Sequence, residues 1–163
     1  MIRRAEKRDI PELARLLYQV NNVHAEGRPD LFRMDRRKYN DEELSLILED
    51  RGKAVFVLTE DDQTVKGYAF CLFEIYEGDH NLVDRKTLYI DDICVDASCR
   101  RQHVGEDLYR HVLAFAKEKG FYNVTLNVWS CNPGARLFYE RMGLTPYKTG
   151  MEVILGEAFS KNM

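Results

Sequence analysis

The order of elements in this chain is best derived outward from one stretch, Val95-Asp96-Ala97-Ser98-Cys99-Arg100-Arg101-Gln102-His103-Val104-Gly105. It joins a run typical of a strand, residues 86–95, to a run typical of a helix, residues 104–119. Such a turn points several backbone N–H groups into one small volume at a helix N-terminus, which suits a phosphate or pyrophosphate. Arginines at its start can add charge-assisted hydrogen bonds. The stretch therefore predicts a site for a phosphate-bearing cofactor, with an ordinary turn balanced by Glu106 and Asp107 as the alternative.

Bulk composition narrows the class of protein. The length of 163 residues suits one core, so we expect a single domain over residues 1–163. The net charge of −3 disfavours nucleic acid as a partner, and no apolar run approaches the length of a membrane span or follows the N-terminal charges as in a signal peptide. No CxxC spacing is present among the cysteines, which are Cys71, Cys94, Cys99 and Cys131. We therefore expect a cytoplasmic protein with reduced thiols, no metal site and no membrane contact.

Hydrophobic periodicity divides the chain into strands and helices. Strands are expected over residues 2–5, 54–59, 65–76, 87–95, 123–129 and 147–155. Helices are expected over residues 10–26, 41–49, 104–119 and 132–143. Asp9 is the expected N-cap of the first helix, with Glu12 three residues later as its capping-box partner. The order β-α-α-β-β-β-α-β-α-β predicts an α/β fold with a mixed sheet and helices on both faces.

A second motif is the tract Asn132-Pro133-Gly134-Ala135-Arg136-Leu137-Phe138-Tyr139-Glu140-Arg141-Met142-Gly143-Leu144. Seven residues are almost two helical turns, so Asn132 and Tyr139 differ by only about 20° around the helix axis. Both can face one cleft, with the small Ala135 between them leaving room for a ligand. The alternative is that Asn132 is only an N-cap before a proline and that Tyr139 is a core aromatic residue.

A third feature is the acid pair Asp91-Asp92 inside an otherwise apolar strand. Adjacent carboxylates there are costly unless they are paired or lie in a cleft. Strict alternation predicts that they point to opposite faces, so that one lines a substrate site and the other is buried with a partner. The alternative for either is a structural ion pair with an arginine.

The order of elements, the loop from Arg100 to Gly105 and the tract from Asn132 to Leu144 together resemble the GCN5-related N-acetyltransferase (GNAT) family. The resemblance implies a mixed, mostly antiparallel twisted sheet of six to seven strands. It also implies acetyl transfer from acetyl-CoA to a primary amine, either a small cationic or polyamine-like amine or a peptide N-terminus. Elements on the acceptor side are then expected mainly in residues 1–84, and the acetyl-CoA core in residues 85–155. The alternative is a non-catalytic acyl-CoA-binding regulatory module, and homodimers are common in the family.

The resemblance also implies roles for the phosphate loop. The pyrophosphate is expected on the loop residues, which are Arg100, Arg101, Gln102, His103, Val104 and Gly105. The family pattern is Arg/Gln-x-x-Gly-x-Gly/Ala, so His103 replaces the first glycine and Gly105 keeps the second. Glycine at such positions permits unusual backbone dihedrals or a close approach of the phosphate, which makes His103 the departure from the pattern.

The remaining implied roles concern the reacting end. The backbone near Ile93 to Val95 is expected to bind the pantetheine amides and to supply the N–H that stabilises the oxyanion. Asn132 is expected at the pantetheine arm, and Tyr139 as the acid that protonates the departing thiolate. Asp91 is the candidate base, because the polyamine acetyltransferases carry an acid pair in the same strand.

The acceptor end is expected among the first two helices, their loop and neighbouring strands. Its candidates are His24, Arg28, Asp30, Phe32, Glu74, Tyr76, Glu77 and Asp79. The acids would suit a cationic amine, although acids on a loop are often only solvated. Core packing is expected for Trp129, Tyr147 and Met151.

Overall fold

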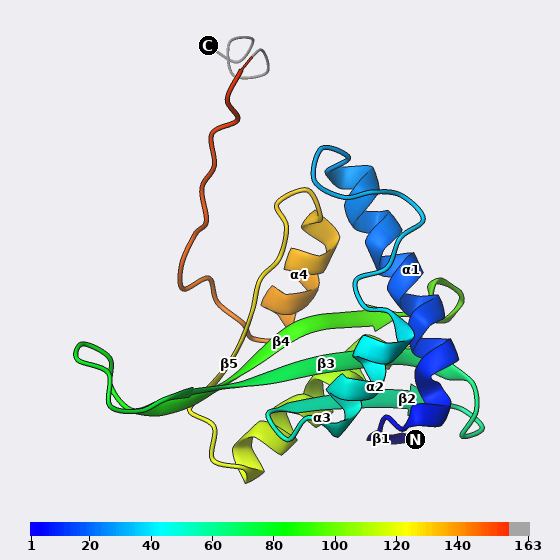
Figure 1. Ribbon diagram of the computed structural model, residues 1–163, viewed down its shortest axis with the longest axis horizontal. Helices are drawn as coiled ribbons and strands as arrows, with labels where there is room; N and C mark the ends of the chain where they lie inside the picture. Colours follow the sequence, from blue (N-terminus) through cyan, green and yellow to red (C-terminus); the bar gives the residue numbers. More distant parts are fainter. Residues whose placement is uncertain (157–163) are drawn as a thin grey trace.

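The computed structural model describes residues 1–156 and shows an α/β fold (Figure 1). Its strands are β1 (Ile2–Arg4), β2 (Lys53–Thr59), β3 (Val65–Tyr76), β4 (Arg85–Val95) and β5 (Asn123–Leu126). Its helices are α1 (Ile10–Gly27), α2 (Asp41–Glu49), α3 (Val104–Glu118) and α4 (Pro133–Arg141), with short 3₁₀ turns at Lys7–Asp9 and Ala97–Cys99. None of the helices described is both long and apolar enough to cross a lipid bilayer.

The sheet has the order β1-β2-β3-β4-β5. The first three pairings are antiparallel, whereas β5 runs parallel to β4. The expected mixed and mostly antiparallel sheet is therefore confirmed. The expected number of six to seven strands is wrong, since the described residues form a sheet of five.

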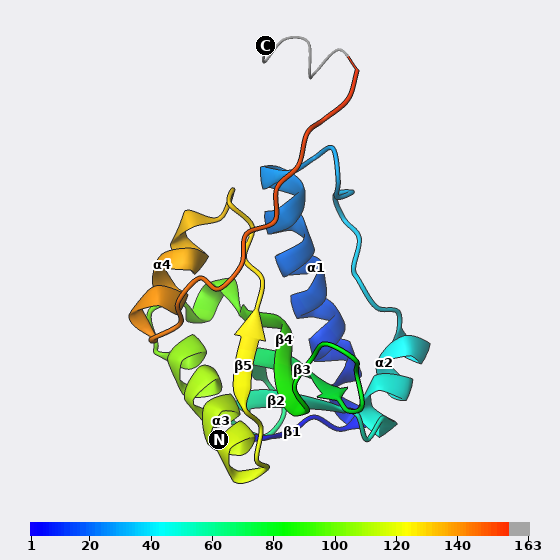
Figure 2. The ribbon, with the colours of Figure 1, turned by 90° about the vertical axis from the view of Figure 1, so that its left-hand side faces the viewer.

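The helices cover both faces of the sheet, as expected (Figure 2). On one face, α1 and α2 bury their leucines against β2 and β3 in a cluster with Tyr68 and Phe70. On the other face, α3 packs its apolar stripe, which includes Leu108 and Val112, against residues such as Leu88. The helical spacing of these apolar residues is what turns each helix toward the sheet.

The expected strand over residues 147–155 is not formed. Tyr147 is 63% exposed, Met151 93% and Leu155 81%, and the segment runs away from the sheet beyond α4 (Figure 1). A segment with alternating apolar residues forms a strand only when a neighbouring strand pairs with it, and no strand among residues 1–144 pairs with this one. The core packing expected for Tyr147 and Met151 is therefore wrong, as it is for Trp129, which is 40% exposed.

The strand β5 ends at Leu126 rather than at Trp129 because its pairing with β4 stops there. Their pairing runs from Thr87↔Asn123 to Ile90↔Leu126 and stops there. At that point the pairing of β4 with β3 shifts register, which marks a bulge. Residues 127–129 consequently have no strand beside them on the β4 side.

The start of α1 also differs from the expected capping box. The Asp9 side chain makes no capping bond to the helix, and Glu12 reaches Arg15 instead. The Asp9 carboxylate accepts two hydrogen bonds from Arg3 at 2.7 and 2.9 Å and one from the Glu6 N–H at 2.8 Å. An ion pair with a residue of β1 has therefore displaced the local cap and ties the strand to the helix.

Candidate active site

The bulge in β4 determines where the two adjacent acids point. Phe70 lies opposite Asp92 and Cys71 opposite Ile90, so Asp91 is the extra residue of the bulge. An extra residue breaks the alternation of side chains. Both carboxylates therefore turn to the face that carries α1 and α2, where Tyr39 and Tyr68 meet them. The expectation that Asp91 and Asp92 lie on opposite faces is wrong.

Asp91 is held by two residues that lie just before Asn40, the N-cap of α2. Its carboxylate accepts hydrogen bonds from Lys38 Nζ at 2.8 and 2.9 Å and from Tyr39 Oη at 2.8 Å. Burial together with the Asp91 charge raises the pKa of Tyr39 to about 12, so its hydroxyl stays a donor. Burial opposes the charge of Lys38, but its bond to Asp91 outweighs this and raises the pKa of the ammonium. The structural ion pair considered for Asp91 is thus present, with a lysine in place of an arginine.

Asp92 has a different environment. Its carboxylate accepts one hydrogen bond from Tyr68 Oη at 2.5 Å, and Tyr68 is fully buried. Burial raises the pKa of Asp92 to about 6, although the bond from Tyr68 acts in the opposite direction. Asp92 can therefore take up a proton near neutral pH, which a carboxylate in water does not do.

Tyr139 of α4 reaches the same region. Burial is the main cause that raises the pKa of its phenol, and the negative charge of Asp92 adds to it. The ring packs edge-on against Phe138, with ring centroids 5.3 Å apart. Tyr139 thus keeps its proton well above neutral pH, and it lies close enough to Asp92 for the charge of that carboxylate to act on its pKa.

The edge of β4 beyond the bulge is open. The pairing with β5 ends at Ile90, so residues 91–95 have a strand only on the β3 side. Asp96 N–H donates to Lys66 O at 2.8 Å, on the β3 side. Because successive amides in a strand point to opposite edges, those of Ile93 and Val95 point into the gap between β4 and β5. These are the residues expected to bind pantetheine, and that role stays a prediction.

The loop after β4 has the shape expected of an anion cradle. Arg101 and His103 both adopt the left-handed conformation, with φ of 65° and 61°. His103 is the N-cap of α3, and its side chain makes no capping bond to the helix. By contrast, α2 and α4 are capped by Asn40 and Asn132. The first amides of α3 are therefore left for water or an anion, beside the exposed side chains of Arg100 and Arg101.

The start of that loop is fixed by Asp96. Burial alone would raise the pKa of the Asp96 carboxyl. Hydrogen bonds from Ser98 and Arg15 outweigh this effect and lower the pKa to about 2. The bond from Arg15 Nη1 measures 2.5 Å and that from Ser98 N–H 3.0 Å. Arg15 lies in α1, so the helix and the loop are joined through an ionised carboxylate.

Gly105 serves packing rather than unusual dihedrals. A Cβ at this position would lie 3.3 Å from Val95 Cγ2 and 3.4 Å from Phe138 Cζ. The φ of Gly105 is not positive, whereas the φ of His103 is 61°. The residue with the glycine-like backbone is thus the histidine, and the glycine lets α3, β4 and α4 converge.

Asn132 does cap α4. Its Oδ1 accepts the Ala135 N–H at 3.3 Å. The capping role considered for Asn132 is confirmed, and its role toward pantetheine stays a prediction. Gln102 and Val104 lie in the loop and the first turn of α3, as the sequence indicated.

The acceptor candidates divide into two places. His24, Phe32 and Trp129 form an aromatic row, with ring centroids 5.1 and 5.5 Å apart. Beside it, Arg28 binds Asp30 at 2.8 Å and Glu152 at 2.6 Å. This row joins the end of α1 to the segment after β5.

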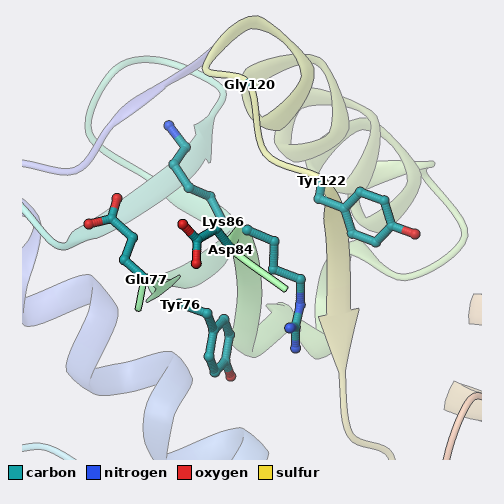
Figure 3. Close-up of a pocket in the computed structure, with 7 residues that line it drawn as sticks. Tyr76, Glu77, Asp84, Lys86, Gly120 and Tyr122 are labelled. Carbon is teal, nitrogen blue, oxygen red and sulfur yellow. The ribbon is translucent and has the colours of Figure 1, made fainter. Parts of the chain in front are cut away.

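The remaining acceptor candidates lie at the hairpin between β3 and β4. There a pocket of about 470 Å³ is lined by Tyr76, Glu77, Asp84, Arg85, Lys86, Gly120 and Tyr122 (Figure 3). Tyr76 donates a hydrogen bond to Glu74 at 2.8 Å, and Arg85 lies over its ring. Arg85 and Asp92 are seven residues apart in one strand, roughly 20 Å, so the hairpin acids, Asp79 among them, lie in a separate place.

Sequence reasoning missed the partners of the acid pair. Lys38 and Tyr39 fall at the end of a polar stretch with no local signal, and they are more than fifty residues from Asp91. Tyr68 lies in an apolar strand and looks like any core aromatic residue. Only the register of β3 against β4, with its bulge, brings these hydroxyls to the carboxylates. Among residues 1–156, no group of three or more potential metal ligands is assembled.

Comparison with known proteins gives the family. Residues 17–144 match the Acetyltransferase (GNAT) family. The chain belongs to the GNAT family of acetyltransferases. Members of this GNAT family generally move an acyl group from acetyl-CoA to an amine. The family predicted from the two motifs is thereby confirmed. A search of the curated proteins gives no significant match.

Solved structures share the fold. A mutant of the BH1408 protein from Bacillus halodurans is 27% identical, with a TM-score of 0.90 over 95% of this chain and 99% of that one. A putative acetyltransferase from Agrobacterium tumefaciens is 23% identical, with a TM-score of 0.73 over 95% and 99% of the two chains. An aminoglycoside acetyltransferase from an uncultured soil metagenomic sample, solved with sisomicin, is 18% identical, with a TM-score of 0.67 over 96% and 95%. The last two show likeness of fold alone.

Proposed function

We propose that this GNAT protein is an N-acetyltransferase that moves an acetyl group from acetyl-CoA to a primary amine. One observation carries the proposal: Asp92, with its pKa raised to about 6, and the protonated Tyr139 adjoin the open edge of β4. Amine acetylation needs a group that accepts a proton from the amine and a group that gives one to the leaving sulfur. This pair provides both.

The residues present fit acetyl-CoA. The uncapped start of α3, next to Arg100 and Arg101, suits the pyrophosphate. The amides of Ile93 and Val95, which point to the open edge of β4, suit the amides of the pantetheine arm. When bound, acetyl-CoA supplies the acetyl group as a thioester.

We assign the base to Asp92 rather than to Asp91, the candidate from the sequence. The oxygens of Asp91 are engaged by Lys38 and Tyr39. The side-chain donor to Asp92 is Tyr68, which carries no positive charge, and burial raises the pKa of Asp92 to about 6. In this proposal Asp92 removes the proton from the ammonium form of the acceptor, directly or through water. The nitrogen lone pair then forms the new bond to the carbonyl carbon.

Tyr139 and the backbone complete the transfer. An N–H from Ile93 or Val95 stabilises the negative charge that develops on the carbonyl oxygen. As the bond between carbon and sulfur breaks, the sulfur receives the phenolic proton of Tyr139. Its raised pKa supports this role, because the phenol stays protonated throughout the neutral range.

The acceptor is proposed to be a small cationic amine. Asp91 is ion-paired with Lys38, but the hydrogen bond to Asp92 comes from an uncharged tyrosine, so the carboxylate of Asp92 favours a cation over a neutral ligand. The aromatic row of His24, Phe32 and Trp129 can pack against the alkyl part of such a molecule. A peptide N-terminus is the alternative acceptor, because it is also a primary amine. For either acceptor, we place residues 1–84 on the acceptor side of the site and residues 85–155 on the acetyl-CoA side.

A panel of amines tests this function. Release of free thiol from acetyl-CoA is measured with diamines, polyamines, amino sugars and short peptides in separate reactions. We expect release that depends on the amine, is strongest with small cationic amines and gives an acetylated product by mass. Tight binding of acetyl-CoA by calorimetry without transfer to any amine would instead support the non-catalytic module, which His103 in the glycine position favours.

We also propose a reducing compartment, the cytoplasm, as the site of action. All four cysteines are free, and burial raises the pKa of the thiols of Cys71 and Cys94 to about 12 in each case. Such thiols are inert. We expect equal activity with and without reductant over the time of an assay.

A further inference from the structure

Two side chains of helix α1 hold the loop that follows β4. Arg15 Nη1 donates a hydrogen bond to Asp96 Oδ2 at 2.5 Å, and the Ala97 N–H donates one to Gln19 Oε1 at 3.1 Å. Arg15 and Gln19 are four residues apart, so they lie on one face of the helix. That face therefore binds two consecutive residues of the loop at the point where the chain leaves the sheet.

Arg15 is itself fixed by other contacts. Its Nε and Nη2 donate to the carboxylate of Glu12 at 3.0 and 2.9 Å, and Nη2 also donates to the carbonyl oxygen of Val65 at 3.1 Å. The Glu12 carboxylate in turn accepts the Val65 N–H at 3.2 Å. Because the guanidinium group is planar and its donors have a fixed geometry, these contacts also fix the direction of Nη1 toward Asp96.

Asp96 transmits this restraint to the loop. Its other oxygen, Oδ1, accepts the N–H and the hydroxyl of Ser98, each at 3.0 Å, at the start of the 3₁₀ turn Ala97–Cys99. The Cys99 N–H donates to the carbonyl oxygen of Asp96 at 2.8 Å. Both oxygens of this buried carboxylate are thus engaged, one by α1 and one by the turn that leads to Arg100.

The rest of the loop depends on that turn. Arg101 and His103 are in the left-handed conformation, which a residue with a side chain keeps only when its surroundings fix it. Within the described part of the chain, no side-chain hydrogen bond joins residues 100–102 to another element. The turn after Asp96 and the start of α3 are therefore the two fixed ends that set where the loop amides point.

We propose that Arg15 is a positioning residue for acetyl-CoA, which acts through Asp96 to hold the loop of residues 96–103 in the form that receives the pyrophosphate. Arg15 acts without touching the ligand, because its donors are engaged by Glu12, Val65 and Asp96. Gln19 supports the same turn through Ala97. The inference rests on the proposed function, which places the pyrophosphate at the start of α3.

Calorimetry with CoA tests this role without turnover. Arg15→Met removes the guanidinium and should raise the dissociation constant of CoA by about tenfold or more, because the lost hydrogen bonds join charged groups. Arg15→Lys keeps the charge and should recover part of the affinity. Gln19→Leu, which removes one neutral acceptor, is the milder variant and should weaken binding by a smaller factor. The same direction of change in all three supports the proposal.

The matched control is Arg3→Met. It removes the ion pair of Arg3 with Asp9, which is more buried than that of Arg15 with Asp96 and joins β1 to the start of α1. Since β1 lies at the opposite edge of the sheet from β5, this variant should lose stability in urea unfolding but bind CoA like wild type. Equal weakening of CoA binding by Arg3→Met and Arg15→Met would overturn the proposal.

A donor without a pyrophosphate separates positioning of the loop from a general loss of structure. With the best amine of the panel, Arg15→Met should raise KM for acetyl-CoA about tenfold and change kcat little. With S-acetylpantetheine, which has no phosphate groups, kcat/KM should be within about twofold of wild type, because the loop then has no ligand to position. A loss of the same size with both donors would show a merely structural role and overturn the proposal.

A double-mutant cycle tests whether Arg15 acts through Asp96. Asp96→Asn keeps an oxygen for the Ser98 N–H and removes the charge that Arg15 meets. The chain with both Arg15→Met and Asp96→Asn should bind CoA no more weakly than Arg15→Met alone, whereas losses that add would overturn the proposal. Unchanged CoA affinity in Arg15→Met would overturn this inference alone. A wild type that binds neither CoA nor acetyl-CoA would overturn the proposed function as well.

Discussion

Two neighbouring side chains, Asp91 and Asp92, differ in what they can do although one bulge turns both to the same face. Asp91 meets a lysine and a tyrosine that neutralise and hold it. Asp92 meets a fully buried tyrosine and no cation within hydrogen-bonding distance among the described residues. Burial then decides the outcome and raises the pKa of Asp92 to about 6. A difference in partners, rather than in residue type, thus separates a structural carboxylate from one that can exchange a proton.

Tyr139 is expected to act on the leaving sulfur. Tyr139→Phe keeps the ring that packs on Phe138 and removes the proton donor, so kcat should fall by roughly 10²-fold or more. Affinity for acetyl-CoA should change little, and titration calorimetry measures it separately. Tyr109→Phe, which removes the hydroxyl of another buried tyrosine, is the control and should keep most of the activity. Equal turnover of wild type and Tyr139→Phe would remove the acid role.

The left-handed backbone conformation of His103 is expected to destabilise the folded state. A residue with a side chain in the left-handed region destabilises the folded state by roughly 1–2 kcal/mol. Glycine avoids this cost, but about 0.5–1 kcal/mol of the gain is lost because glycine has more conformational freedom in the unfolded state. His103→Gly should therefore raise the free energy of unfolding by up to about 1 kcal/mol in urea titration. Arg100→Gly, at a φ of −64°, is the matched control and should lower it. A loss of stability in His103→Gly would mean that the imidazole contributes more than the strain costs.

Among the elements, α3 packs on the sheet only because small residues let it come close. Gly67 of β3 lies under its first two turns, and a Cβ there would be 2.8 Å from Cys94 O and 2.9 Å from Val104 Cγ1. Gly105 serves the same approach from the helix side. Because the amides of the phosphate loop are the first amides of α3, the position of this helix also sets the position of the anion cradle.

Gly67→Ala is consequently expected to destabilise the fold. The added methyl group would press on a backbone carbonyl, and overpacking of this kind costs typically 1–3 kcal/mol. Urea unfolding measures the loss. Gly134→Ala in α4, where the nearest atom lies 4.0 Å away, is the matched control and should show no loss. If both variants kept wild-type stability, the tight contact under α3 would be refuted.

Local patterns predicted most of these elements. The bounds of α2 and β3 agree with the periodicity over residues 41–49 and 65–76. The bulge at Asp91 and the short β5 were not predictable, because they depend on pairing between strands rather than on any local preference. The same holds for residues 147–155, whose pattern is that of a strand but which find no partner strand in the body of the chain.

At the scale of the whole molecule, residues far apart in the sequence form the site. Lys38 and Tyr39 precede α2, Asp92 lies in β4 and Tyr139 in α4, and the anion cradle opens α3. The motifs predicted the loop, Tyr139 and the acid pair as members of one site. They did not predict which acid is ion-paired, because Lys38 and Tyr68 reach the acids only through the folded sheet. The family supplies the general chemistry, and the geometry supports the assignment of the base.

The pH dependence of the rate tests the assignment of Asp92 as the base. With the best amine of the panel and saturating acetyl-CoA, wild-type kcat should fall on the acid side with an apparent pKa near 6, as Asp92 becomes protonated. Asp92→Asn should lose about 10²–10⁴-fold in kcat at neutral pH and also lose this acid limb. Asp91→Asn should keep the limb, even if Lys38 is left unpaired and the rate drops.

Asp92→Asn and Asp91→Asn, compared in one pH series, therefore test the assignment of the base most directly. We expect the acid limb to disappear in Asp92→Asn and to persist in Asp91→Asn. An acid limb that persists in Asp92→Asn with a rate near wild type, or that disappears in Asp91→Asn alone, would contradict the assignment.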